Sequence, residues 1–231
     1  MAKPLTGEVR VEEDVPGAFA RLVVEEATKT LADPGRGGAP FRLGCSGSSS
    51  GEHCFARLAT HDELDWSRVE CFLADERCVD PDDPAANQRA LRSVLAKRLS
   101  SLAGFHPMSC AEGPEPYEQL LRSAGSLDLL QLGFGPDGHT ASLFPSSQAL
   151  DAPSDRLVAR NADPSGRNPF ERLTLTYAGI ALARLVVLVV MGEEKKEAFE
   201  RVTRGEALPA AEVRAERVVW LVEPGAAGAS V

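Results

Sequence analysis

The sequence predicts an α/β fold, a single doubly wound and mostly parallel sheet with helices on both faces. Short apolar runs, of which Leu185–Met191 is the most apolar, alternate with segments whose apolar residues recur at helical spacing. A strand that is apolar throughout is typical of a parallel sheet covered on both faces, and alternating strands and helices indicate right-handed crossovers. The 231 residues contain no repeat or low-complexity linker, so we expect one domain over residues 1–231.

The first part of the chain predicts a helix, a strand and a second helix. Asp14 is a suitable N-cap, and the apolar residues that follow it have helical spacing. Phe41–Cys45 reads as a strand and leads into the small-residue loop Ser46–Gly51, after which a helical pattern runs to Ala59. A loop of this kind before a helix suits a phosphate, since backbone N–H groups and the helix dipole both attract an anion. Its alternative is a flexible Gly/Ser connection.

The next strand ends in charged residues. Val69–Leu73 is apolar and is followed by Asp75, Glu76 and Arg77. These three side chains lie either at the carboxyl edge of the sheet or in a solvated loop with a surface ion pair. Asn87 is expected to cap the helix that follows.

The second half of the chain contains its most distinctive segment. A helix over Pro114–Ala124 is predicted to precede a buried strand at Leu129–Leu132, which opens into a loop rich in glycine and delivers Asp137 and His139. Such a loop at the end of a strand is where open α/β sheets place their ligand chemistry. We therefore expect His139 to be a catalytic group.

The remaining strands are predicted from short apolar or alternating runs. They are Leu157–Ala159, Arg172–Thr176, Leu185–Met191 and Val218–Leu221, with a helix at Tyr177–Ala183. Lys195 follows the third of these strands, at the start of a helix, where a cation opposes the helix dipole. That unfavourable position points to an anionic ligand.

Three predicted strand ends thus carry functional side chains. They are Asp75 and Arg77, Asp137 and His139, and Lys195. The carboxyl ends of parallel strands meet at one edge of a sheet, so these residues are expected to converge on one crevice.

Composition limits the function classes. The formal net charge of −9 weighs against nucleic acid or an anionic membrane as a partner and allows a small anionic substrate. No apolar run approaches the roughly 20 residues that span a bilayer, and the first residues lack the apolar core of a secretory signal, so we expect a cytoplasmic protein. The five cysteines are irregularly spaced with no CxxC pair, which predicts reduced thiols and no metal site.

These motifs together resemble the 6-phosphogluconolactonase family, within the superfamily that includes glucosamine-6-phosphate deaminase. The segments that carry the resemblance are CSGSSSG at Cys45–Gly51, FLADERCV at Phe72–Val79, LDLLQLGFGPDGHTASLFP at Leu127–Pro145, ERLTLT at Glu171–Thr176 and GEEK at Gly192–Lys195. Arg77, where deaminases usually have Tyr, and Thr140–Pro145 favour the lactonase branch. The family loop usually reads Ser-Gly-Gly-Ser-Thr-Pro, from which Ser48, Ser50 and Gly51 depart. The resemblance implies the deaminase-like fold.

The resemblance implies hydrolysis of 6-phospho-D-glucono-1,5-lactone to 6-phosphogluconate, in the oxidative pentose phosphate pathway. That reaction needs a base for water, a group that stabilises an oxyanion, and cations for the phosphate. His139 is the expected base, because histidine ordinarily titrates at about pH 6.5. Asp137 or Asp75 would orient it, and the sequence leaves that choice open.

The other expected roles concern the oxyanion and the phosphate. Arg77, or the N–H groups of the loop that contains Gly135 and Gly138, would hold the oxyanion. The residues expected at the phosphate are Arg172, Lys195, Arg77, Ser46, Gly47, Ser48, Ser49 and Ser50. No metal or organic cofactor is expected, because an activated ester needs neither.

Two other functions stay open on the same fold. One is a sugar-phosphate deaminase or isomerase, and the other is a non-catalytic protein that binds a sugar phosphate. In all three cases the expected partner is a small anionic sugar phosphate, with no nucleic acid and no membrane. A monomer is expected, with a weak homodimer as the alternative.

Overall fold

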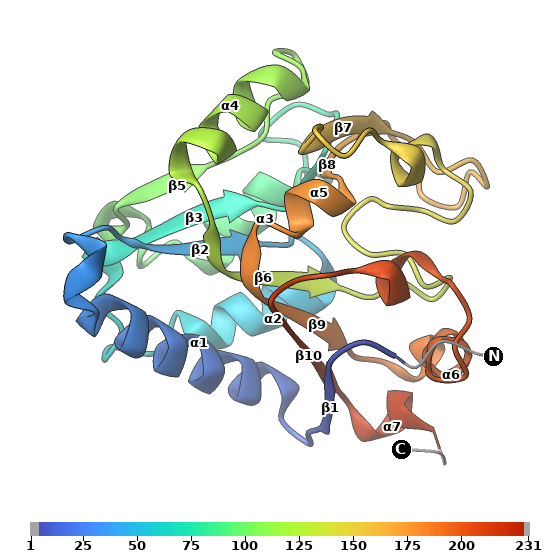
Figure 1. Ribbon diagram of the computed structural model, residues 1–231, viewed down its shortest axis with the longest axis horizontal. Helices are drawn as coiled ribbons and strands as arrows, with labels where there is room; N and C mark the ends of the chain where they lie inside the picture. The colour runs from blue at the N-terminus through green and yellow to red at the C-terminus, as the bar shows by residue number, and fades with distance from the viewer. Residues whose placement is uncertain (1–4, 229–231) are drawn as a thin grey trace.

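The computed structural model describes residues 5–228, and its centre is a seven-stranded sheet in which every neighbouring pair of strands is parallel (Figure 1). In spatial order the strands are β1 (Glu8–Val11), β10 (Arg217–Val222), β9 (Ala183–Val190), β6 (Leu127–Gly133), β2 (Phe41–Cys45), β3 (Val69–Leu73) and β5 (Gly104–His106). The predicted α/β fold is confirmed. Residues 1–4 and 229–231 of the predicted domain lie outside the described residues.

Helices cover both faces of this sheet. In Figure 1, α1 and α2 lie below the sheet, and α4 and α5 lie above it. The helices are α1 (Val15–Ala32), α2 (Ser49–Leu58), α3 (Asn87–Val94), α4 (Pro114–Ala124), α5 (Tyr177–Ile180), α6 (Lys196–Thr203) and α7 (Pro224–Ala227). Asp14 caps α1 as predicted, because its Oδ1 accepts a hydrogen bond from the Gly17 N–H at 3.0 Å. No helix among residues 5–228 is long and apolar enough to cross a membrane.

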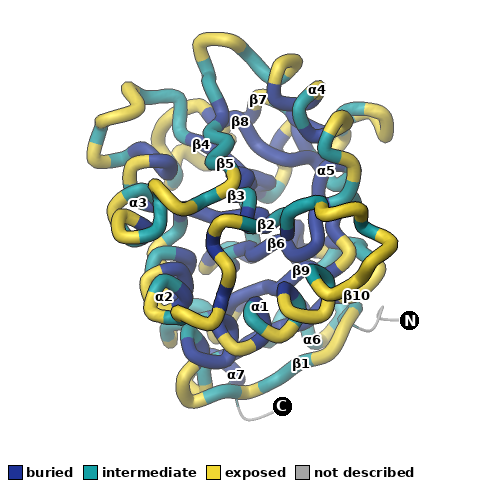
Figure 2. The backbone as a smooth tube through the Cα atoms, turned by 90° about the vertical axis from the view of Figure 1, so that its left-hand side faces the viewer, coloured by how far each residue is buried: buried dark blue, intermediate teal, exposed yellow. Residues whose placement is uncertain are grey.

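The core of the molecule lies along β6 and β9, the dark centre of Figure 2. Every residue of β9 from Leu185 to Val190 is buried. Burial on both faces explains why this strand is apolar at successive positions.

The order of the strands reverses between β2 and β6. From β2 the chain continues outward through β3 to β5, whereas β6 lies on the other side of β2 and leads to β9 and β10. Open α/β sheets bind ligands in the crevice at such a switch point. The loops that leave these two strands are Ser46–Ser48 and Phe134–His139, so both predicted ligand loops lie there.

A second, smaller sheet was not predicted. It is antiparallel, with the order β4 (Asp75–Arg77), β8 (Arg172–Leu175) and β7 (Val158–Asn161). The chain turns out of the main sheet after β3, and the Leu175 N–H donates to the Ala74 carbonyl at 2.8 Å. Sequence patterns predict a strand but not its partner, and three-residue strands such as β4 and β5 are too short to show a period.

The prediction that Asn87 caps α3 is wrong. The N-cap position is Ala86, and the buried Glu76 carboxylate accepts the N–H groups of Asn87 and Gln88 at 2.7 and 2.8 Å. A carboxylate from a distant strand therefore replaces the local side chain. The Asn87 side chain instead donates to the Asp75 carbonyl at 3.0 Å.

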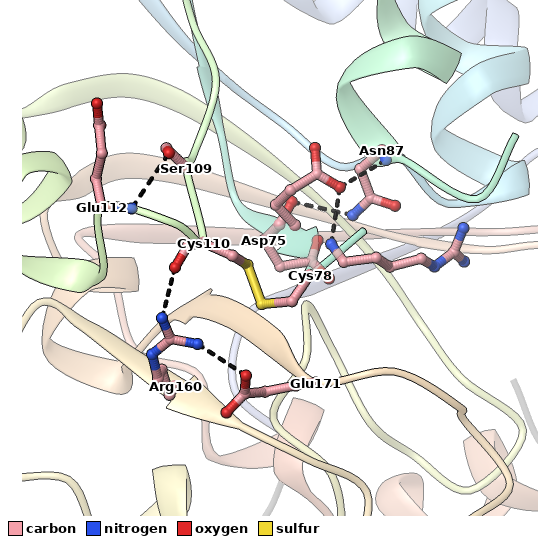
Figure 3. The surroundings of a disulfide bond; sticks show 10 residues. Asp75, Cys78, Asn87, Ser109, Cys110, Glu112, Arg160 and Glu171 are labelled. Atoms are coloured by element: carbon pink, nitrogen blue, oxygen red, sulfur yellow. Dashed lines mark hydrogen bonds and ion pairs between the residues drawn. A yellow bond between two sulfur atoms is a disulfide. The ribbon is translucent and has the colours of Figure 1, made fainter. Parts of the chain in front are cut away.

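The prediction that all cysteines are reduced is also wrong. Cys78, next to β4, forms a disulfide with Cys110, in the segment that precedes α4, with a Cα–Cα distance of 5.3 Å (Figure 3). Arg160 on β7 contacts this region through the Cys110 carbonyl and Glu171. The three other cysteines are free and buried. The two bridged residues are 32 positions apart, and only the departure of β4 from the main sheet brings them together.

Candidate active site

A cavity of about 210 Å³ opens at the switch point. Its walls come from the loops after β2 and β6, from β4 and β8, and from the start of α3. The predicted residues that line it are Ser46, Ser48, Ser49, Ser50, Asp75, Arg77, Gly135, His139, Arg172 and Lys195. The structure therefore brings together all three predicted strand ends. Gly47, Asp137 and Gly138 are not part of this lining.

His139 is held by the loop that carries it. The Gly135 N–H donates to the His139 carbonyl at 2.9 Å, and the Gly138 N–H donates to the Gly135 carbonyl at 2.9 Å. A Cβ at position 135 would lie 2.1 Å from His139 Nδ1. Only glycine leaves room for the imidazole there, and Gly138 has the φ of +81° that favours glycine.

Asp137 is the carboxylate that contacts the imidazole. Its Oδ1 lies 2.6 Å from His139 Nδ1 and accepts the His139 N–H at 3.1 Å. Burial would raise the pKa of Asp137, but the hydrogen bond and charge of His139 outweigh it, and the net effect is a lowered pKa. An ionised carboxylate can only accept, so Nδ1 carries the proton and Nε2 is left as the basic nitrogen. Nε2 has no partner among the described residues.

Asp75 lies elsewhere in the cavity. Its Oδ2 accepts the Ser142 hydroxyl at 2.6 Å, and both side chains are buried. Ser142 is positioned in turn by its N–H, which donates to Thr174 Oγ1 on β8 at 3.1 Å. Asp75 thus joins the small sheet to the segment that follows His139.

Three cations face the same cavity. Arg172 is 5% exposed, and its Nη1 has no hydrogen-bond partner among residues 5–228. Desolvation lowers the pKa of Arg172, partly offset by the nearby Asp75. Lys195 Nζ lies 3.4 Å from Glu194 Oε1. Arg77 Nη1 donates to the Ala85 carbonyl at 2.7 Å, and the other guanidinium nitrogens of Arg77 have no partner within residues 5–228.

The Ser46–Ser50 loop supplies further donors. Ser48 is the N-cap of α2, and its hydroxyl oxygen accepts the Gly51 N–H at 3.2 Å. Gly47 packs on α3, since a Cβ there would lie 2.4 Å from Asn87 Cβ. The N–H groups of Gly47, Ser49 and Ser50 have no acceptor among the described residues. They are available to an anion at the positive end of the helix.

Several lining residues were not predicted from the sequence. Ser142 stands within the distinctive GPDGHTASLFP segment, so its position was a usable signal. Asn168 lies in a loop that carries no local pattern, and Asp163 Oδ2 holds it through its N–H and its Nδ2 at 3.0 and 2.8 Å. Among residues 5–228, no group of three or more His, Cys, Asp and Glu side chains could hold a metal ion.

Comparison with known proteins identifies relatives over most of the chain. The chain is 37% identical over 180 residues to the human GDH/6PGL endoplasmic bifunctional protein. The matched region covers 71% of this chain and 22% of that much longer protein. It is 34% identical over 204 residues to 6-phosphogluconolactonase of Mycobacterium leprae, covering 79% of this chain and 82% of the relative. The crystal structure of 6-phosphogluconolactonase from Thermotoga maritima superposes with a TM-score of 0.77 at 29% identity, over 94% of this chain and 99% of that one.

The fold extends beyond the lactonases. A monomeric glucosamine-6-phosphate deaminase superposes with a TM-score of 0.77 over 95% of this chain and 98% of its own, at 18% identity. That likeness confirms the predicted deaminase-like fold. A family model described as glucosamine-6-phosphate isomerases/6-phosphogluconolactonase matches residues 11–220. The chain therefore belongs to the family of glucosamine-6-phosphate isomerases and 6-phosphogluconolactonases.

Proposed function

We propose that this protein hydrolyses 6-phospho-D-glucono-1,5-lactone to 6-phosphogluconate. The observation that carries the proposal is the Asp137–His139 pair, in which Nε2 of His139 has no partner among the described residues. His139 lines the same cavity as Arg77, Arg172 and Lys195. A base and a cluster of cations in one small cavity suit an ester that carries a phosphate. The relatives of Mycobacterium leprae and Thermotoga maritima are named 6-phosphogluconolactonases.

In the first step, His139 Nε2 takes a proton from a water molecule while the water oxygen attacks the lactone carbonyl carbon. Asp137 stabilises the imidazolium that forms. The negative charge develops on the carbonyl oxygen. The N–H groups of Gly135 and Gly138 already donate within their own loop, so we assign the oxyanion to the free guanidinium nitrogens of Arg77.

In the second step, the tetrahedral intermediate collapses. The bond between the carbonyl carbon and the ring oxygen breaks, and His139 Nε2 returns its proton to that oxygen, which becomes a hydroxyl group. The new carboxylic acid ionises and releases one proton into solution. One histidine can serve both steps, because His139 acts as a general base in the first and, once protonated, as a general acid in the second.

The phosphate is assigned to Arg172, Lys195 and the Ser46–Ser50 loop. A buried guanidinium nitrogen without an acceptor is costly, and Arg172 Nη1 has no acceptor among the described residues. A dianionic phosphate would supply the missing acceptor through charge-assisted hydrogen bonds. The helix N-terminus beside it adds the free N–H groups of the loop.

The test is proton release from freshly prepared lactone by the purified protein, compared with spontaneous hydrolysis. We expect acceleration by the wild type and a loss of about 10²-fold or more in kcat for His139→Ala, the range of a general base. Equal rates for the two proteins would refute the assignment of His139. Release of ammonia from glucosamine 6-phosphate, without lactone hydrolysis, would establish the deaminase alternative instead.

A further inference from the structure

We propose that Gln131 is a positioning residue that holds the Ser46–Ser50 loop in its anion-binding conformation. The inference rests on the proposed function only in identifying the anion as the phosphate of the substrate. Gln131 itself does not line the cavity. It acts from the strand below, through the loop.

Gln131 is a polar side chain at the centre of the core. It lies on β6 opposite Val187 of β9 and is 0% exposed. Its neighbours in the strand, Leu130 and Leu132, are also fully buried. Its Oε1 accepts the Ser46 N–H at 3.2 Å, whereas its Nε2 has no partner among the described residues.

Packing alone does not account for this glutamine. A buried amide nitrogen without an acceptor lowers stability, and an apolar side chain of similar volume would avoid that cost. Among residues 5–228, the one hydrogen bond of the Gln131 side chain is with the loop. We therefore attribute the presence of the amide to the loop rather than to the core.

The loop is fitted to this amide. A Cβ at Gly51 would lie 3.1 Å from Gln131 Oε1 and 2.2 Å from the Ser46 carbonyl oxygen. A Cβ at Gly133, two positions along β6 and therefore on the same face of the sheet, would lie 2.8 Å from Ser48 Oγ. Gln131 and Gly133 thus form the floor on which the loop rests.

The hydrogen bonds within the loop continue from that floor. Ser46 Oγ accepts the Ser48 N–H at 3.3 Å and lies 3.2 Å from Ser48 Oγ, which accepts the Gly51 N–H at 3.2 Å. The backbone N–H groups of Ser46, Ser48 and Gly51 therefore all donate within the loop or to Gln131.

The donors that remain are the N–H groups of Gly47, Ser49 and Ser50. Two of them belong to the first turn of α2, a helix of ten residues that begins at Ser49. Fixing the internal donors fixes the orientation of the free ones before a ligand arrives. Preorganisation of this kind raises affinity because less ordering is required on binding. Loss of the Gln131 bond should therefore weaken phosphate binding without altering the chemistry at His139.

The experiment compares Gln131→Met and Gln131→Leu with the wild type. Met keeps the length of the side chain without an acceptor. We expect the KM for the lactone and the Ki for inorganic phosphate to rise together by about five- to tenfold, the value of one hydrogen bond. We expect kcat to change by less than about twofold. The Tm should change little, because the substitution removes the unpaired Gln131 Nε2 and leaves the buried Ser46 N–H without an acceptor. Gln119→Met, at an exposed position of α4, is the matched control.

The opposite pattern would overturn the inference. A fall in Tm with unchanged KM and Ki means that Gln131 serves the core alone. If the variants fail to fold, the wild type is titrated with inorganic phosphate instead, and each backbone amide is followed by NMR. The Ser46 N–H should stay protected from exchange while the amides of Gly47, Ser49 and Ser50 shift. A Ser46 N–H that exchanges freely would refute the proposal.

The phosphate measurements separate this inference from the proposed function. If the wild type binds phosphate at these amides and Gln131→Met weakens that binding, the role of Gln131 holds even if the lactone is not a substrate. If the lactone is hydrolysed but both variants keep the wild-type KM and Ki, only the role of Gln131 fails.

Discussion

Asp137→Asn isolates the contribution of one negative charge to the reaction. The substitution keeps the shape of the side chain and removes the charge that faces His139 Nδ1 at 2.6 Å. It also allows an amide N–H to donate to Nδ1, which would leave the proton on Nε2 and abolish the basic nitrogen. Both effects act on the imidazole and neither acts on the phosphate.

The expected magnitude follows from the burial of the pair. The side chains of Asp137 and His139 are 13% and 20% exposed, so water screens them only partly. Two unit charges at about 4 Å interact by about 4 kcal/mol at an effective dielectric constant of about 20. The imidazolium is only partly formed in the transition state, so we expect a loss of about 2–4 kcal/mol, or roughly 30- to 1,000-fold in kcat.

The assay is the initial rate of proton release at several enzyme concentrations, which separates catalysis from spontaneous hydrolysis of the lactone. KM should change little, because the cations that we assign to the phosphate are untouched. Asp82→Asn, at an exposed site, should behave as the wild type. A kcat within about threefold of wild type in a folded Asp137→Asn protein would show that the carboxylate does not assist His139.

Three further predictions follow from the cations, the disulfide and a buried carboxylate. Arg172→Ala and Lys195→Ala should each raise KM by about 10- to 100-fold with a smaller change in kcat, because each removes a charge-assisted hydrogen bond to the phosphate. An unchanged KM in both variants would mean that the phosphate binds elsewhere. The double variant Cys78→Ser and Cys110→Ser should lose about 3–4 kcal/mol of stability, because the disulfide closes a loop across 32 positions and lowers the entropy of the unfolded chain. Reduction of the wild type should have the same effect, and equal urea midpoints with and without reductant would contradict this prediction. Burial would raise the pKa of Asp163, but hydrogen bonds from Ser165 and Asn168 outweigh it and hold that pKa below its ordinary value. The contribution of Asp163 to stability is therefore complete above about pH 4 and is lost as the pH falls further. Asp163→Asn should flatten the acid side of the stability curve, and an unchanged curve would count against this assignment.

The residues at the ends of the parallel strands were the predictable part of the site. The apolar runs of β2, β3, β6 and β9 are long enough to be read directly, and the side chains that follow a parallel strand all lie at one edge of the sheet. That rule is sufficient to bring His139 and Lys195 into one cavity. The glycines around His139 were informative because the backbone there excludes a side chain.

The parts that sequence reasoning missed depend on contacts between distant segments. Glu76 caps α3 although 11 positions separate it from Asn87, and Asp75 meets Ser142 across 67 positions. Neither pairing has a local pattern, because each is set by the turn of β4 out of the main sheet. The choice between Asp75 and Asp137 as the partner of His139 could not be made before that turn was known.

The altered loop after β2 has an explanation that only the structure supplies. The usual family loop has glycine at position 48 and proline at position 51, and this chain has Ser48 and Gly51. A proline at that third helical position has no N–H, so a capping serine would have no donor there to accept. Gly51 restores the N–H, and Ser48 Oγ accepts it at 3.2 Å, an interaction typical of an N-cap. Gly51 also leaves the space that Gln131 Oε1 occupies. Ser48 and Gly51 therefore form one capped turn, and this turn lies against the Gln131 side chain.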